Sequence, residues 1–79
     1  MNEFTGKLAV ITGGGEGTGR EIAIQLANAG CDLAICDVSI QKLNQTKRHC
    51  EAAANKSVKI TSHICSVVDE VQVLAFAKA

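Results

Sequence analysis

The stretch LAVITGGGEGTGREIA, residues 8–23, joins an apolar run to a helical pattern through five glycines. Residues 8–12 form a short continuous apolar run, which is typical of a strand buried on both faces of a parallel sheet. Apolar residues then recur at helical spacing over residues 17–29, and Gly30 stands where a C-terminal cap glycine belongs. The stretch therefore predicts a strand that passes through a glycine turn directly into a helix.

The following segments repeat this alternation. Residues 32–36, DLAIC, indicate a second buried strand, and Ser39 is placed to be the N-cap of a second helix. Residues 58–65, VKITSHIC, alternate apolar with polar for most of their length, which favours a third strand at a sheet edge. The apolar stripe of the second helix comprises Ile40, Leu43, Cys50 and Ala54.

A third helix is predicted over residues 67–79, VVDEVQVLAFAKA. Asp69 and Glu70 would lie in its first turn, where negative charge interacts favourably with the helix dipole. The apolar residues of this helix would share one face and pack on the sheet; they are Val71, Leu74 and Ala75.

This order of elements predicts half of a doubly wound α/β fold. We expect a three-layer Rossmann-type parallel sheet that is incomplete (βαβαβα), with right-handed crossovers and the strand order 3-2-1. The first two helices would cover one face and the third helix the other. The first strand would lie at an open edge of the sheet, where a fourth strand should pair. Such an edge can pair with another chain, so we expect it to promote association. Residues 1–79 make one small domain at most.

Composition and charge exclude several classes of protein. Eight basic and eight acidic side chains balance, which argues against a nucleic-acid or anionic-membrane surface. The start, MNEFTGK, lacks the pattern of a signal peptide, and no apolar run approaches the roughly 20 residues that span a bilayer. We therefore expect a cytoplasmic protein.

The cysteines do not follow a known site spacing. Their gaps match neither a CxxC redox motif nor a paired zinc-knuckle pattern, and nothing signals secretion. His49 adjoins a cysteine, but adjacent residues on one helix diverge by about 100°, so no metal site is predicted. We expect reduced, buried thiols at all four positions, Cys31, Cys36, Cys50 and Cys65.

The glycines have a physical use at a strand-to-helix turn. Unpaired N–H groups and the helix dipole attract a phosphate to a helix N-terminus, provided that no side chain blocks its approach. Gly13 follows the strand, Gly17 lies where a pyrophosphate would touch backbone, and Gly19 would let the helix lie close to the sheet. A glycine turn without a ligand is the alternative.

The spacing of the glycines narrows the ligand class. The strict dinucleotide pattern GxGxxG fails, because Thr18 occupies the last glycine position counted from Gly13. A Walker loop also fails, because Arg20 and Glu21 replace its lysine and hydroxyl. The pattern TGxxxGxG does fit, over residues 12–19.

With its flanks GKLAVITGG, GTGREIA, CDVS and CSVVDE, this motif resembles the short-chain dehydrogenase/reductase family of oxidoreductases along the whole chain. The resemblance implies a nicotinamide dinucleotide site, with the glycine turn around the adenosine ribose and pyrophosphate. It implies that residues 1–79 are the N-terminal portion of a dinucleotide-binding Rossmann domain. The implied cofactor-binding residues are Gly13, Gly15, Glu16, Gly17, Thr18, Gly19, Asp37, Ser66 and Val67.

Asp37 indicates which dinucleotide would bind. It lies about 20 residues beyond the glycine turn, where a carboxylate can accept hydrogen bonds from the ribose hydroxyls and would repel a 2′-phosphate. Glu16 and Val38 stand where similar proteins that use NADP often carry Lys or Arg, so NAD is preferred over NADP. The alternative role for Asp37 is a turn carboxylate that forms a cap near Ser39.

Two positions depart from the family pattern. Glu16 would bring a negative charge near the pyrophosphate unless its side chain points to solvent or toward the ribose. Ser66 stands where the family usually has an Asp that accepts a hydrogen bond from the adenine amino group. A serine hydroxyl also accepts one, with shorter reach and without charge assistance, so adenine binding would be weaker.

In the resembled family, hydride transfer needs a tyrosine acid/base, a nearby lysine and a serine that orients the carbonyl. The chain contains no tyrosine, and the family's catalytic segment would lie beyond Ala79. We therefore assign no catalytic residue and expect the chain alone to be inactive. As a free chain it should also be either poorly soluble or dependent on a partner, which a second copy in a homo-oligomer could provide. The complete protein would transfer hydride between NAD and an alcohol or carbonyl substrate. A non-catalytic nucleotide-binding or subunit-pairing fragment is the alternative. An S-adenosylmethionine methyltransferase fits less well, because the first strand is apolar up to Thr12.

Overall fold

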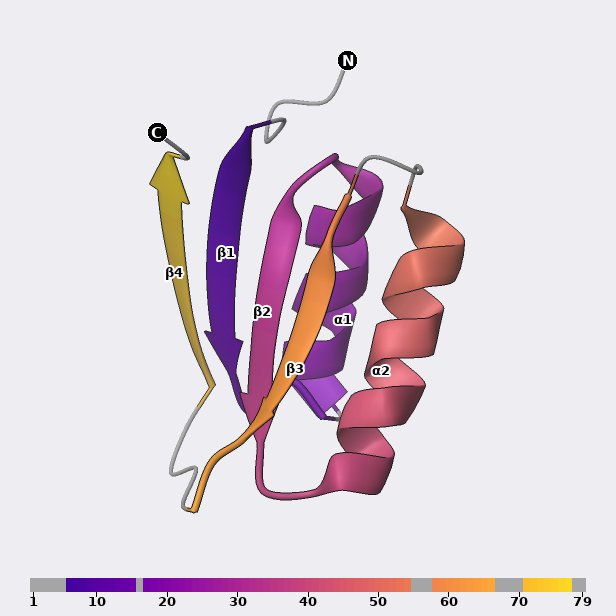
Figure 1. Cartoon of the computed structure of the whole chain (residues 1–79), viewed down its shortest axis with the longest axis vertical. Helices are drawn as coiled ribbons and strands as arrows, with labels where there is room; N and C mark the ends of the chain where they lie inside the picture. The colour runs from indigo at the N-terminus through magenta and orange to yellow at the C-terminus, as the bar shows by residue number, and fades with distance from the viewer. Residues whose placement is uncertain (1–5, 16, 55–57, 67–70, 78–79) are drawn as a thin grey trace.

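The computed structural model describes residues 6–15, 17–54, 58–66 and 71–77, which form one sheet with helices packed against it (Figure 1). The α/β class predicted from the sequence is confirmed. None of the helices among these residues is long and apolar enough to cross a membrane. In chain order, the elements are β1 (Lys7–Thr12), α1 (Gly17–Asn28), β2 (Asp32–Asp37), α2 (Ile40–Ala53), β3 (Ile60–Ile64) and β4 (Gln72–Ala77).

The sheet has the order β3-β2-β1-β4, and its first three strands are parallel. In the register, Leu8 pairs with Asp32 at the start of β1, and Leu33 pairs with Ile60 at the start of β3. The predicted parallel order 3-2-1 is therefore confirmed. Because these strands run the same way, their carboxyl ends share one edge of the sheet, and the residues that follow them meet there.

The core lies between the sheet and the two helices. Alternate residues of β1 and β2 point toward the helices, as the pleat of a strand requires. Small alanines on the buried side of α1 allow this helix to lie close to the strands, while α2 contributes a larger leucine. The fully buried members are Ala9, Ile11, Ala23, Ala27, Cys31, Leu33, Ile35, Leu43 and Cys50, with Ile60 at their margin.

The predicted third helix is wrong for residues 72–77, which form β4. This strand pairs antiparallel with β1, from Lys7 opposite Ala77 to Thr12 opposite Gln72. Without β4, the outer edge of β1 would present backbone N–H and C=O groups that need partners. Residues 72–77 contain valine and phenylalanine, which favour strands, and they pair with this edge. The edge of β1 that was expected to be open is therefore occupied. Asp69 and Glu70 lie outside the described residues.

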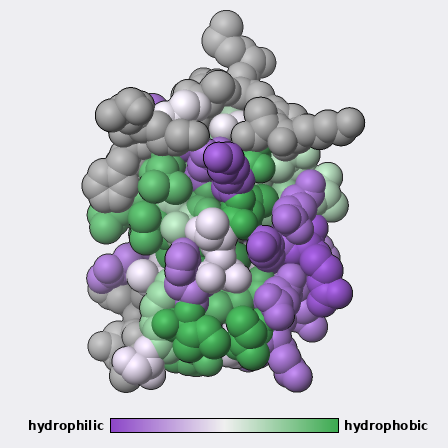
Figure 2. All heavy atoms as spheres, viewed as in Figure 1, coloured by the Kyte–Doolittle hydropathy of each residue, from purple (hydrophilic) through white to green (hydrophobic). Residues whose placement is uncertain are grey.

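The sheet has one covered face and one uncovered face. In the view of Figure 1, α1 lies behind the strands and α2 lies beside β3. No described helix covers the front of the sheet, so the described residues form two layers instead of the expected three. Apolar side chains appear on this front face in Figure 2. Leu74 of β4 is 56% exposed there, since its partner in the register, Val10, also points away from the helices.

Candidate functional site

The glycine turn, residues 13–15, is hydrogen-bonded to the carboxyl end of β2. The N–H groups of Gly13 and Gly14 both donate to the carbonyl oxygen of Cys36, over 2.7 and 3.2 Å. Gly13 has φ 74° and Gly17, which begins α1, has φ 63°; both values favour glycine over residues with a side chain. The turn therefore delivers the N-terminus of α1 to the edge where the parallel strands end.

Two further glycines are required by close contact. A Cβ on Gly19 would overlap the carbonyl oxygen of Gly13 and lie 3.0 Å from the Cα of Gly14. A Cβ on Gly15 would lie 2.6 Å from Oδ2 of Asp37. The absence of side chains thus brings α1 against the turn, and the turn against the carboxylate.

Asp37 ends β2 and is only 9% exposed. Its Oδ2 accepts a hydrogen bond from the Gly15 N–H at 2.8 Å, and its Oδ1 accepts one from the Val38 N–H at 2.6 Å. The cap of α2 is Ser39, whose hydroxyl accepts from the Lys42 N–H at 3.3 Å. The Asp37 carboxylate therefore accepts hydrogen bonds from the glycine turn and from Val38, whereas Ser39 is the residue that caps α2.

A clasp on the other side of the turn was not predicted. The carbonyl oxygen of Gly15 accepts from Arg20 Nη2 at 2.6 Å and from the Thr46 hydroxyl at 3.0 Å. Thr46 in turn accepts from Arg20 Nε at 2.9 Å and is fully buried. One sequence signal could have found it: Thr46 lies on the buried stripe of α2, three residues after Leu43, where an apolar side chain is expected.

The described members of the predicted cofactor-binding set gather at one edge. The turn and Asp37 lie as above, and Thr18 is exposed in the first turn of α1. Ser66 is exposed shortly after β3, and the N–H of the preceding Cys65 donates to the Asp37 carbonyl at 2.9 Å. Glu16 and Val67 lie outside the described residues.

Two of the four cysteines differ from the prediction. Cys36 and Cys65 form a disulfide with their Cα atoms 5.9 Å apart, well inside the range that such a bond needs. The parallel pairing of β2 with β3 brings them together, which a sequence gap cannot reveal. Cys31 and Cys50 are buried and lie outside this disulfide, as predicted. Burial, with a smaller contribution from Glu51, raises the pKa of the Cys50 thiol to about 11.

Comparison with known proteins agrees with this arrangement. Residues 7–79 match the sequence model of the family described as short chain dehydrogenase. The chain belongs to the short-chain dehydrogenase family. It is therefore an oxidoreductase-family chain with a Rossmann-like fold, and the family resemblance inferred from the glycine motif is confirmed.

A curated relative of this short-chain dehydrogenase chain is levodione reductase of Leifsonia aquatica, which is 38% identical over 76 residues. The match covers 96% of the chain but only 28% of the reductase. The crystal structure of levodione reductase superposes with a TM-score of 0.76 at 33% identity, covering 80% of this chain and 24% of that one. The chain thus spans about a quarter of the length of such relatives.

Solved short-chain dehydrogenases similar to this chain include complexes with either nicotinamide dinucleotide. A metagenomic short-chain oxidoreductase in complex with NADP has a TM-score of 0.71 at 30% identity, with 80% of this chain and 27% of that one covered. An NAD⁺-bound xylitol dehydrogenase has a TM-score of 0.72 at 27% identity, with 80% and 23% covered. The family uses nicotinamide cofactors, and both forms occur among the neighbours.

Proposed function

We propose that residues 1–79 are the NAD(H)-binding portion of a short-chain dehydrogenase that, as a complete protein, transfers hydride between the cofactor and an alcohol or carbonyl substrate. The observation that carries this proposal is the contact between Asp37 and the glycine turn. Its Oδ2 lies 2.8 Å from the Gly15 nitrogen, so a carboxylate stands at the rim of a turn without side chains. Ribose hydroxyls need such an acceptor next to the place where the pyrophosphate binds.

The pyrophosphate would bind at the start of α1. This helix begins at Gly17 and runs for 12 residues, so its first N–H groups and dipole point toward the turn. Gly17 has open space around its Cα, and Thr18 is exposed beside it, which leaves the approach to the helix end clear. Because Gly15 and Gly19 have no side chain, the turn lies against Asp37 and α1 lies against the turn.

The adenosine would lie along the edge formed by β2 and β3. A carboxylate has about four lone-pair sites, and the two backbone bonds of Asp37 leave acceptor capacity for two ribose hydroxyls. Val38 and Ile64 are 53% and 60% exposed at this edge and offer apolar surface to the adenine. Ser66 and Val67 would meet its amino side. A 2′-phosphate would face the Asp37 carboxylate, which favours NAD over NADP.

This portion would bind the cofactor but would not catalyse hydride transfer. Short-chain dehydrogenases use a tyrosine as acid/base, and the chain contains none. The groups that contact the small-molecule substrate would therefore come from other parts of a complete cytoplasmic protein, in which homo-oligomerisation is also proposed. A second candidate function, non-catalytic nucleotide binding with subunit pairing, is favoured by Leu74, which is 56% exposed on the uncovered sheet face.

The test is a titration of the protein with NADH, NADPH and S-adenosylmethionine by calorimetry. We expect NADH to bind more tightly than the other two. Asp37→Asn should weaken NADH binding about tenfold, because a charged acceptor for two hydroxyls is lost, and should narrow the gap to NADPH. The matched control is Asp32→Asn, since Asp32 is equally buried at the other end of β2. Tighter binding of NADPH by the unchanged protein, or equal losses in both variants, would contradict the assignment.

A further inference from the structure

The Cys36–Cys65 disulfide lies at the edge where the proposed nucleotide site is assembled. Cys36 is the penultimate residue of β2, and Cys65 directly follows β3. Both residues are half-buried, whereas the other two cysteines, Cys31 and Cys50, are completely buried. The four cysteines therefore divide into a half-buried disulfide pair and two fully buried residues outside it.

Backbone hydrogen bonds connect both cysteines of the disulfide to the proposed nucleotide site. The carbonyl of Cys36 holds the glycine turn through the N–H groups of Gly13 and Gly14. The N–H of Cys65 donates to the carbonyl of Asp37 at 2.9 Å, and Ser66 follows at once. The disulfide thus joins the segment that carries the turn and the ribose carboxylate to the segment that carries the adenine-side serine.

We propose that Cys36–Cys65 is a thiol–disulfide exchange site whose redox state sets the affinity of the neighbouring nucleotide site. This inference rests on the proposed function for its ligand. The reaction partner is a small thiol and its disulfide. A thiolate attacks one sulfur of the pair to form a mixed disulfide, and a second thiolate displaces the protein sulfur. Two external thiols become one external disulfide, and the protein gains two protons and two electrons as two thiols.

The bond should favour nucleotide binding. With the disulfide closed, Asp37 and Ser66 have a fixed spacing before the ligand arrives, so less ordering is required on binding. With the disulfide open, the two segments are held together by the β2–β3 hydrogen bonds and by the packing of both strands on the core, with no covalent link. Reduction should therefore weaken NADH binding about three- to tenfold. Disulfides that form in reducing compartments are commonly transient or redox-sensing, which suits such a role.

The other two thiols should take no part. Cys31 and Cys50 are 0% exposed, so an external thiolate has no access to them in the folded protein. Their behaviour gives an internal reference. A native alkylation experiment should label no cysteine in the oxidised protein and two in the reduced protein, whereas unfolding the reduced protein should expose all four.

The experiment equilibrates the protein with glutathione disulfide or with dithiothreitol, counts alkylated cysteines by mass spectrometry and titrates each form with NADH. Amide hydrogen exchange of residues 13–15 and 65–66 is measured in both forms without nucleotide. We expect two reversible thiols, weaker NADH binding after reduction and faster exchange in both segments. The double variant Cys36→Ser/Cys65→Ser should match the reduced protein under both treatments. The control Cys50→Ala should keep the full redox response.

The outcomes separate this inference from the proposed function. If NADH binds equally in both redox states and exchange is unchanged, the redox inference is overturned while the cofactor proposal stands. If NADH binds in neither state, both the cofactor proposal and the affinity effect are overturned, although the alkylation count still tests the exchange chemistry. Labelling of Cys31 or Cys50 in the native protein would contradict the selectivity.

Discussion

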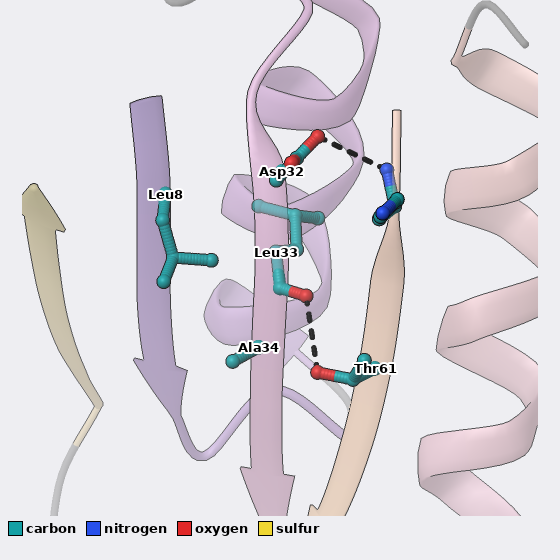
Figure 3. A pocket seen from close by; sticks show the side chains of 6 residues that line it. Leu8, Asp32, Leu33, Ala34 and Thr61 are labelled. Carbon is teal, nitrogen blue, oxygen red and sulfur yellow. Dashed lines mark hydrogen bonds between the residues drawn. The ribbon is translucent and has the colours of Figure 1, made fainter. Parts of the chain in front are cut away.

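The two ends of β2 carry the same side chain in different surroundings. Asp37 and Asp32 are 9% and 8% exposed, and each accepts a hydrogen bond from a backbone N–H. At the amino end, Asp32 binds the Lys59 N–H at 3.0 Å beside a hollow lined by Leu8, Leu33, Ala34 and Thr61 (Figure 3). At the carboxyl end, Asp37 binds a glycine turn next to a helix N-terminus.

This difference teaches that a buried, hydrogen-bonded carboxylate does not by itself identify a site. Both ends of β2 satisfy the general rule that buried polar groups find partners. Only the carboxyl end combines the carboxylate with backbone that no side chain covers and with the positive end of a helix dipole. Substitutions at matched positions of the two ends should therefore differ in their effect on NADH binding.

The largest effect is expected for Gly19→Ala. The added Cβ would overlap the Gly13 carbonyl, which is backbone and cannot move without displacing α1 or the turn. We expect a loss of about 3 kcal/mol in the free energy of unfolding, together with loss of NADH binding. Urea denaturation and calorimetry measure the two quantities.

The control for this substitution is Gly30→Ala at the opposite end of α1. Gly30 has φ 92°, so an alanine there should cost about 1 kcal/mol through backbone strain. Its NADH affinity should remain that of the unchanged protein. An equal loss of NADH affinity in both variants would show that overall stability, and not the packing of the turn, controls binding.

A smaller effect is expected for Thr46→Val. The substitution removes one donor to the Gly15 carbonyl and the acceptor of Arg20 Nε in a fully buried position. We expect a loss of about 2 kcal/mol in the free energy of unfolding and weaker NADH binding, because the turn loses half of its clasp.

Thr61→Val is the matched change at the amino end. Thr61 is exposed, and its hydroxyl donates to the Leu33 carbonyl over a long 3.4 Å. The expected change is within about 0.5 kcal/mol, with unchanged NADH affinity. If the two valine variants unfold at the same urea concentration, the clasp adds nothing beyond an ordinary surface hydroxyl.

The smallest effect concerns Cys50, near the C-terminal end of α2. Burial raises its thiol pKa from 9.0 to about 11, so the folded protein favours the neutral thiol. This contribution is complete below pH 9.0 and is lost as the pH rises toward about 11, since the unfolded chain ionises first. At about pH 10 the loss should be about 1 kcal/mol.

The measurement compares melting temperatures of the unchanged protein and Cys50→Ala across that pH range. The difference between the two proteins should shrink as the pH rises, because alanine has no thiol to ionise. Cys31→Ala serves as the control and should keep the decline. A pH-independent difference for Cys50→Ala would contradict the raised pKa.

The sequence predicted the parts of the fold that depend on local patterns. The apolar runs of β1 and β2, the stripe of α2 and the cap at Ser39 are each encoded within a few neighbouring residues. The place of the site was equally accessible, because parallel strands must end at one edge and the glycines mark where a helix begins there.

What could not be predicted depends on contacts between distant segments. The local pattern of residues 72–77 led to the prediction of a helix, but in the structure these residues pair with the edge of β1 as a strand, and a local pattern does not contain that distant partner. The disulfide requires the register of β2 against β3, and the clasp requires α1 and α2 to meet over the turn. Each of these features follows from how the elements pack, so the sequence of no single segment predicts it.

The antiparallel pairing of β4 also sets the route by which the sheet can form. It joins Lys7 to Ala77, almost the full length of the chain, whereas β1 and β2 meet across one helix. Closing so long a loop carries a large entropic cost that only later contacts repay, so this pairing should come last in folding. Until then β1 has one side unmatched, which makes the time before β4 docks the interval of greatest risk for aggregation.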